Sequence, residues 1–178
     1  AGRYQDVAGI SAENADDGCK ACIAGRHSTR IAAVSGAMCE NCNVGRWSAQ
    51  VALSTVSSSG DWCEPCIAGT FSTSVGASSI RTCEPCPTGS AQAEEGLPYC
   101  LPCVPGMVQH LTGQAICTAC IIDSYQNVTG KTTCKACTSG RTAKNPGSTS
   151  CSFCPVGKFT LAKGASCEKC PSGYESTM

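Results

Sequence analysis

Apolar and polar residues alternate along this chain only over short stretches. An apolar residue stands at every second position from Trp47 to Leu53, which predicts a two-faced strand there. Other loops carry alternations of two to four residues, such as the one from Phe71 to Val75. Glycines interrupt every stretch long enough to carry an apolar stripe with the 3.6-residue period of a helix. The pattern therefore predicts short β-hairpins and turns, with little or no helix.

Large apolar side chains are too scarce for a conventional hydrophobic core. Leu, Ile, Val and Phe together make up 26 of the 178 residues, fewer than a domain of this length needs to offset its conformational entropy. Disordered chains usually carry a high net charge, whereas this chain has 13 basic and 13 acidic residues. One residue in ten is cysteine, 18 in all. We infer that cysteine supplies the order, and we expect small disulfide-rich repeats that form an elongated, solenoid-like rod.

The balanced charge excludes several classes of function. The isoelectric point is about 6.8, so the chain has no basic footprint for nucleic acid or for an anionic membrane. No apolar run approaches the ~18 residues of a membrane span. The sequence contains no nucleophile–base–acid constellation and no phosphate-binding loop. We expect no enzyme activity, no cofactor, no nucleic-acid partner and no membrane span in this segment.

The cysteines fall into nine Cys-x-x-Cys pairs whose first members are 16 to 24 residues apart. Three residues after the second cysteine of each pair stands a glycine, and only Asp123 breaks this rule. A second glycine precedes most first cysteines by three or four residues, after a loop rich in Ser and Thr. Two residues after the first glycine, most often, comes an aromatic residue or histidine: His27, Trp47, Phe71, Tyr125 and Phe159. Chance does not phase four features over eight copies, so the chain is a repeat array.

The phasing defines eight full repeats between two partial ones. Ala1 to Tyr4 fit the end of a repeat, and the pair that ends at Cys170 opens another, so we expect this segment to continue in a longer array. The predicted bounds are 1–21 for the end of a truncated repeat, 22–41, 42–65, 66–85, 86–102, 103–119, 120–136, 137–153 and 154–169 for the full repeats, and 170–178 for the start of a truncated one.

Each phased position has a physical role. The glycine after the pair is expected to supply a positive φ in a tight turn, and Asp123 is compatible with this because aspartate enters the left-handed region more readily than most residues. The aromatic residue is expected to pack on the disulfide of its own repeat. Ala91, Val108 and Thr142 occupy the same position in other repeats, which should pack less tightly.

The simplest interpretation of the pairs is a disulfide ladder, in which the second cysteine of one pair bonds the first cysteine of the next. Each bridge closes a loop of 12 to 20 residues, and a loop near 15 residues contributes about 3 kcal/mol on the chain-entropy model. Cys19 and Cys170 are expected to pair outside this segment. The predicted bridges are Cys22–Cys39, Cys42–Cys63, Cys66–Cys83, Cys86–Cys100, Cys103–Cys117, Cys120–Cys134, Cys137–Cys151 and Cys154–Cys167.

Spacing alone leaves two other interpretations open. Two neighbouring Cys-x-x-Cys pairs can hold a tetrahedral zinc ion, although zinc arrays usually carry basic surfaces that this chain lacks. A pair such as Cys63-Glu64-Pro65-Cys66 also has the proline of some redox motifs, but a redox centre needs a helix start in a βαβ unit. His27 is better explained as a variant of the aromatic position than as a metal ligand.

The loops carry candidate glycosylation sites. Asn127-Val128-Thr129 is an N-glycosylation sequon in a turn-like loop, which predicts an N-glycan on Asn127 if the chain is secreted. The tracts from Ser54 to Ser59 and from Phe71 to Ser79 are rich in small hydroxyl residues and are candidates for O-glycans.

The repeat unit resembles known extracellular modules. Cys154-Pro155-Val156-Gly157-Lys158-Phe159, closed by Cys167, resembles the opening single-disulfide module of tumour-necrosis-factor-receptor (TNFR) cysteine-rich domains, as does the stretch from Cys66 to Cys83. Both also resemble ephrin-receptor-like and EGF-like repeats, and these likenesses imply an extracellular disulfide-bonded rod. TNFR domains add a two-disulfide module that is missing here, so the long arrays of algal and protist surface proteins, including mastigonemes, are the closer likeness.

Two functions from different classes follow from these observations. The first is a structural, glycosylated segment of an extracellular filament or cell-surface appendage, whose partners are itself or other filament subunits and glycans. The second is a receptor or adhesion ectodomain that binds a protein ligand, for which the longest loop, Asn43 to Trp62, is the candidate surface. An intracellular zinc-binding array with four cysteines per site is the third.

Overall fold

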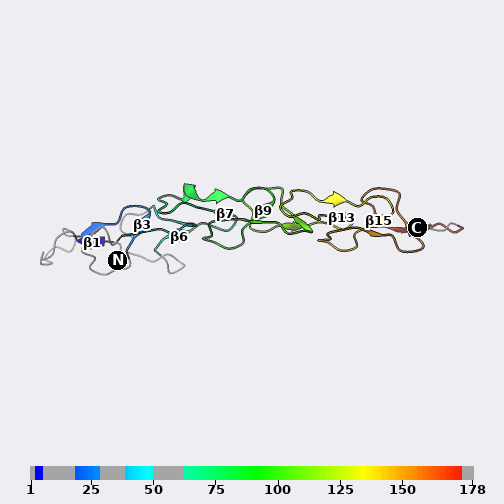
Figure 1. The fold of residues 1–178 in the computed structure, drawn as a ribbon, viewed down its shortest axis with the longest axis horizontal. Coiled ribbons are helices and arrows are strands. Elements are labelled where there is room, and N and C mark those ends of the chain that lie inside the picture. The colour runs from blue at the N-terminus through cyan, green and yellow to red at the C-terminus, as the bar shows by residue number, and fades with distance from the viewer. Residues whose placement is uncertain (1–2, 6–18, 29–38, 50–61, 174–178) are drawn as a thin grey trace. The chain divides into compact units, whose positions relative to one another are not determined.

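Short antiparallel hairpins are the recurring element of the fold (Figure 1). The computed structural model describes residues 3–5, 19–28, 39–49 and 62–173. Among these residues the only helix is a single 3-10 turn, η2 (Ile80–Thr82), and none is long and apolar enough to span a membrane. The strand pairs are β1 (Arg3–Gln5) with β2 (Cys19–Ala21), β3 (Arg26–His27) with β4 (Glu40–Asn41), β5 (Arg46–Trp47) with β6 (Glu64–Pro65), β7 (Thr70–Phe71) with β8 (Glu84–Pro85), β9 (Ser90–Ala91) with β10 (Leu101–Pro102), β11 (Met107–Val108) with β12 (Thr118–Ala119), β13 (Ser124–Tyr125) with β14 (Lys135–Ala136), β15 (Arg141–Thr142) with β16 (Ser152–Phe153), and β17 (Lys158–Phe159) with β18 (Glu168–Lys169).

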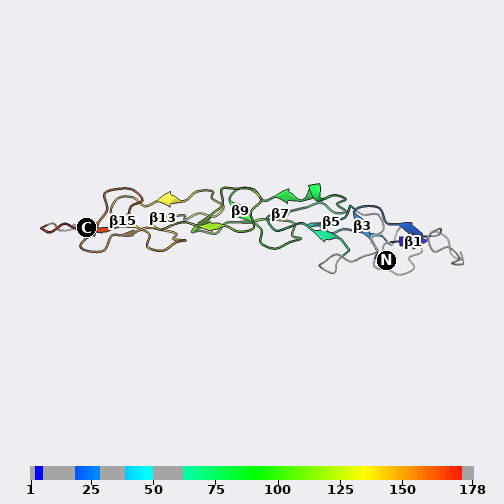
Figure 2. The ribbon, with the colours of Figure 1, turned by 180° about the vertical axis from the view of Figure 1, so that it is seen from behind.

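The predicted fold class of small disulfide-rich repeats with little helix is confirmed. Within the strand predicted from Trp47 to Leu53, Trp47 ends β5, which is labelled in Figure 2, and the described residues Ser48 and Ala49 are not in a strand. Residues 50–53 of that prediction lie outside the described part. The chain divides into two compact units, Ala1–Pro85 with Gln92–Cys100 and Cys86–Ala91 with Leu101–Met178, and both are built from the same kind of hairpin.

We call a module the stretch from the second cysteine of one pair to the first cysteine of the next. Module 103–117 shows its construction. The amide of Met107 donates to the Val104 carbonyl at 3.0 Å, and Gly106 between them has φ 87°, which are features of a type II turn. Strands β11 and β12 then pair, and the Cys120 amide returns to the Gly106 carbonyl at 2.9 Å. The turn therefore reverses the chain, so that the Cys-x-x-Cys pair at the end of the module returns to the turn that follows the pair at its start.

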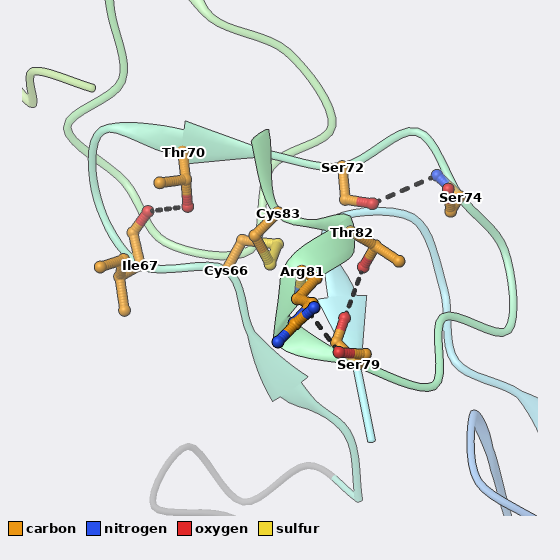
Figure 3. The surroundings of a disulfide bond; sticks show 9 residues. All are labelled: Cys66, Ile67, Thr70, Ser72, Ser74, Ser79, Arg81, Thr82 and Cys83. Atoms are coloured by element: carbon orange, nitrogen blue, oxygen red, sulfur yellow. Dashed lines mark hydrogen bonds between the residues drawn. A yellow bond between two sulfur atoms is a disulfide. The ribbon is translucent and has the colours of Figure 1, made fainter. Parts of the chain in front are cut away.

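The predicted positive φ of the turn position is confirmed, including its exception. Asp123 has φ 59° and is the only non-glycine residue of the described part with positive φ. The residue after the turn glycine often closes the turn a second time through its side chain. In Figure 3 the Thr70 hydroxyl donates to the Ile67 carbonyl at 2.7 Å, beside the Cys66–Cys83 bridge. Local hydrogen bonds thus hold each turn without a hydrophobic core.

The core consists of cystine sulfur and small or polar side chains. Val108 is the only large aliphatic side chain buried in the described residues, whereas others, such as Ile121 at 74% and Val156 at 83%, are exposed. The residue three positions after each turn glycine, or after Asp123, is buried, and together these residues form a column that the repeat phasing did not reveal. Its members are Ser28, Ser48, Ser72, Gln92, Gln109, Gln126, Ala143 and Thr160.

The three glutamines of this column each tie down their own loop. The Gln126 side-chain amide donates to the Thr133 carbonyl at 2.8 Å, and its oxygen accepts from the Val128 amide at 3.2 Å. Gln92 and Gln109 make the equivalent two bonds in their modules. Because the carbonyl acceptor always precedes a first cysteine, the glutamine fixes the loop where the next pair begins.

Neighbouring modules are joined through their main chains. The Gly106 amide donates forward to the Gln126 carbonyl at 2.7 Å, and the Gly130 amide donates back to the Cys103 carbonyl at 2.8 Å. The same forward bond starts at Gly25, Gly45, Gly69, Gly89, Asp123 and Gly140, and the same backward bond starts at Gly76, Gly96, Gly113, Gly147 and Gly164. Gly76 fills this role although it lies seven residues before Cys83, which is why the sequence spacing did not reveal it.

The turn glycines also touch the second module along. A Cβ placed on Gly106 would lie 2.1 Å from the carbonyl oxygen of Gly147, and a Cβ on Gly89 would lie 2.3 Å from that of Gly130. Gly25 and Gly45 face Gly76 and Gly96 in the same way. Positive φ is therefore only half of the requirement for glycine, because the backbones also approach too closely for any side chain.

This double requirement separates two substitutions. Gly106→Ala and Gly140→Ala both place alanine at positive φ, at about 1–2 kcal/mol each, but nothing lies within 4 Å of a Cβ on Gly140. Gly106→Ala must also displace the Gly147 carbonyl, so we expect a further ~1–3 kcal/mol of lost stability. Hydrogen exchange of the β11–β12 and β15–β16 amides measures both losses, and equal losses would contradict the close approach.

Candidate functional site

The disulfide ladder is the most extensive chemical feature of the chain. The structure joins seven of the expected pairs, with Cα–Cα distances of 5.6 to 5.8 Å. These are Cys22–Cys39, Cys42–Cys63, Cys66–Cys83, Cys103–Cys117, Cys120–Cys134, Cys137–Cys151 and Cys154–Cys167. Cys86 and Cys100 are also disulfide-bonded, as the eighth expected bridge requires. Cys170 is a half-buried free thiol, and the side chain of Cys19 lies outside the described part.

The buried position of the ladder favours a structural role. The second cysteine of a pair is at most 1% exposed at Cys22, Cys42, Cys66, Cys86, Cys103, Cys120 and Cys137. A thiol in solution must reach a sulfur atom to exchange with it, so these sulfurs are shielded while a module stays folded. A thioredoxin-like centre needs a bridge within one Cys-x-x-Cys. The seven bridges instead all join one pair to the next.

One bridge has a histidine beside it. The Nδ1 atom of His27 lies 3.5 Å from Cys63 Sγ, and with Cys42 these three groups offer donor atoms within 4.8 Å of one another. The two sulfurs are bonded to each other and carry no thiolate charge, which a zinc ligand requires. His27 therefore lies against the Cys42–Cys63 bridge of the following module.

Asp123 forms a hydrogen-bonded cluster that the sequence analysis did not anticipate. Its Oδ1 accepts from the Thr142 hydroxyl at 2.6 Å, and its Oδ2 accepts from the Ser166 hydroxyl at 2.5 Å. These residues belong to three successive modules, 120–134, 137–151 and 154–167. The Asp123 carboxylate therefore links its module to the next one and to the second one along. Other turns reach the second module along through the close glycine contact. Sequence had marked Asp123 only as an exception to the glycine rule, because its partners lie 19 and 43 residues away.

The environment of Asp123 stabilises its charged form. The hydrogen bonds from Ser166 and then Thr142 lower the pKa of the Asp123 carboxyl below its ordinary value, and a backbone hydrogen bond with Ala143 lowers it further. Burial of the side chain, which is 5% exposed, opposes these effects. The cluster lines a cavity of about 300 Å³ together with Lys144 and Lys158. With both carboxylate oxygens engaged by hydroxyls, the arrangement holds modules together.

The Asn127 sequon lies on an exposed turn after β13. Asn127, Val128 and Thr129 are all exposed, whereas Gln126 before them is buried. The Asn127 Oδ1 accepts a hydrogen bond from Lys135 Nζ at 3.1 Å. That ammonium group also lies 5.8 Å from the centre of the Tyr125 ring. The sequon is therefore accessible, with its amide held on the side of the hairpin where Tyr125 lies.

The second hydroxyl-rich tract is only partly accessible. In the stretch from Phe71 to Ser79, Ser72 is buried and accepts from the Ser74 amide at 3.3 Å, while Ser79 accepts from the Arg81 amide at 3.2 Å and begins η2 (Figure 3). Thr73, Ser74 and Ser78 are exposed and remain the O-glycan candidates. The tract from Ser54 to Ser59 lies outside the described residues.

Comparison with known families agrees with this architecture. Residues 106–154 match the family described as tyrosine-protein kinase ephrin type A/B receptor-like. No curated protein sequence is significantly similar to the chain. The chain thus carries cysteine-rich repeats that resemble ephrin-receptor-like modules, and with its disulfides this points to an extracellular or cell-surface location.

The Asp123 cluster predicts a pH dependence of stability. Because the folded pKa is lower than the ordinary value of 3.8, the contribution of Asp123 is fully present above that value and is lost as the pH falls through the folded pKa. We expect wild type to lose stability below about pH 4 more steeply than Asp123→Asn, which keeps a residue suited to positive φ. Urea unfolding between pH 7 and pH 2 measures the difference. Glu168→Gln, at an exposed carboxylate, is the control and should follow wild type.

The ladder predicts the response to an alkylating reagent. Without reductant, the bridged cysteines should not take up the reagent. Proteolysis without reduction should release linked peptides such as those joined by Cys103 and Cys117. Prior treatment with a metal chelator should change nothing. Thiols that become reactive only after chelation would establish the zinc array in place of the ladder.

Proposed function

We propose that this chain is a structural segment of an extracellular filament or cell-surface appendage of the mastigoneme kind. The array acts as a mechanical element and not as an enzyme. The match to an ephrin-receptor-like family and the buried bridges support the extracellular part of this proposal. The regular repetition of one hairpin, with forward and backward main-chain bonds in every module from Cys66 to Cys151, supports the structural part.

The observation that carries the proposal is the path that tension takes. A pulling force can run along Cys-x-x-Cys, across a bridge with a Cα–Cα distance near 5.8 Å, and into the next pair. This path allows at most about 16 Å per repeat, because three residue steps add roughly 3.5 Å each. The loops lie outside the load path, so their lengths can vary without changing the maximum extension. Such tolerance suits a filament under drag.

The alternative is a receptor or adhesion ectodomain with a protein ligand. The family name favours it, since the matched family is named for receptors. A ligand-binding array concentrates exposed apolar residues in one or two modules. Here they recur at the same position after the second cysteine, as Ile23, Ile67, Val104 and Ile121, which supports even contacts with like subunits or glycans instead. The predicted repeat bounds and the elongated rod are part of the structural proposal. The intracellular zinc array is the third candidate function.

Single-molecule pulling tests the load path. We expect the oxidised chain to reach a short, stiff contour of at most about 16 Å per repeat. After reduction, a 17-residue repeat can stretch to roughly 58–60 Å. The contour should therefore lengthen about three- to fourfold. A contour that reductant leaves unchanged would mean that the bridges bear no load, and the structural proposal would lose its support.

A further inference from the structure

Module 120–134 places an aromatic ring, an amide and a hydroxyl residue at alternate positions. Tyr125 ends β13, Asn127 follows two residues later, and Thr129 two residues after that. In module 137–151 the same three positions hold Thr142, Lys144 and Pro146. Only module 120–134, among the modules of the described part, therefore combines a sequon with an aromatic residue before it.

Lys135 shows that the ring and the amide lie on the same side of the hairpin. It is the cross-strand partner of Tyr125 in the β13–β14 pair. Its ammonium nitrogen lies 5.8 Å from the Tyr125 ring centre and 3.1 Å from Asn127 Oδ1. The Asn127 amide can be no farther from the ring centre than those two distances combined. Tyr125 is half-buried, so part of its ring is open to solvent next to the amide.

We propose that Asn127 carries an N-glycan whose first N-acetylglucosamine packs against the Tyr125 ring and stabilises module 120–134. A pyranose ring presents a face of C–H groups, and an aromatic ring is a suitable apolar partner for it. The Lys135 bond occupies Oδ1, whereas the sugar attaches to Nδ2, so both can persist together. The inference requires passage through a secretory pathway but does not depend on the proposed filament role.

The modification balances as a simple group transfer. The Nδ2 of Asn127 attacks the anomeric carbon of a lipid-diphosphate-linked oligosaccharide. A C–N bond forms, the C–O bond to the diphosphate breaks, Nδ2 loses one proton, and the lipid diphosphate leaves with the electron pair. No oxidant or reductant takes part.

Packing against Tyr125 gives the glycan a defined structural effect. An exposed sugar would leave the opening of the module unchanged. A sugar that covers the ring must separate from it when the hairpin opens, so it should slow the opening of the β13–β14 pair. Hydrogen exchange of the amides in that pair measures this opening.

The test uses the whole chain secreted from eukaryotic cells. An endoglycosidase leaves one N-acetylglucosamine on Asn127, and the unglycosylated arm is the same chain with Thr129→Ala, which removes the sequon and keeps Asn127. Hydrogen exchange of the β13–β14 amides measures how often the hairpin opens. With one sugar in place, we expect exchange to be about two- to tenfold slower in wild type and in Tyr125→Phe, which keeps the ring. In Tyr125→Thr, which has the residue of the next module at this position, one sugar and no sugar should give equal rates.

A second measurement needs no variant. In the proton spectrum of the trimmed glycoprotein, protons of the sugar on Asn127 should shift upfield through the ring current of Tyr125. The proposal is overturned by an unmodified Asn127 in the secreted chain, by sugar protons without an upfield shift, or by a sugar effect in Tyr125→Thr equal to that in wild type. None of these results would bear on the load path of the ladder.

Discussion

The burial of at least one cysteine in every bridged module from Cys22 to Cys151 is the constraint on which the rest of the structure depends. Each described module has a cystine where a globular domain has leucine and isoleucine, and its strands are only two residues long in the modules from Cys22 onward. A two-residue hairpin has no independent stability. The bridge closes a loop and so lowers the conformational entropy of the unfolded module. Main-chain hydrogen bonds to the neighbouring modules supply the remaining stabilisation. Stability is therefore a property of adjacent modules, not of one core.

Close backbone approach follows from this arrangement. Without side chains to fill the space between modules, the turn of one module must touch the loop of the second module along, as Gly106 touches Gly147. Asp123 solves the same problem with a side chain, since its carboxylate reaches hydroxyls in the next two modules. At this junction, hydrogen bonds to a charged carboxylate take the place of the close backbone contact. The junction is therefore sensitive to acid, whereas the glycine junctions are not.

The phase of cysteine and glycine was enough to predict the hairpins, the turn geometry and the pairs that the structure joins, because these depend on residues close in sequence. The partner of His27, the role of Gly76 and the contacts of Asp123 were not predictable, because each depends on how modules meet. The buried column after the turn carries Ser, Gln, Ala and Thr, so no shared chemistry marks it. Only the repeated glutamines at Gln92, Gln109 and Gln126 offered a phased signal for it.

Native-state hydrogen exchange on a chain that lacks one central bridge tests this account most directly. In a Cys120→Ser, Cys134→Ser double variant, amides that bond into or out of module 120–134 should lose protection at least tenfold, among them those of Gly106, Asp123, Gly130 and Gly147. The Gly89 and Gly164 amides bond only between other modules and should keep their protection. The account would be contradicted if protection were lost only within the module, or lost equally at all of these amides. Either result would mean that adjacent modules do not stabilise one another.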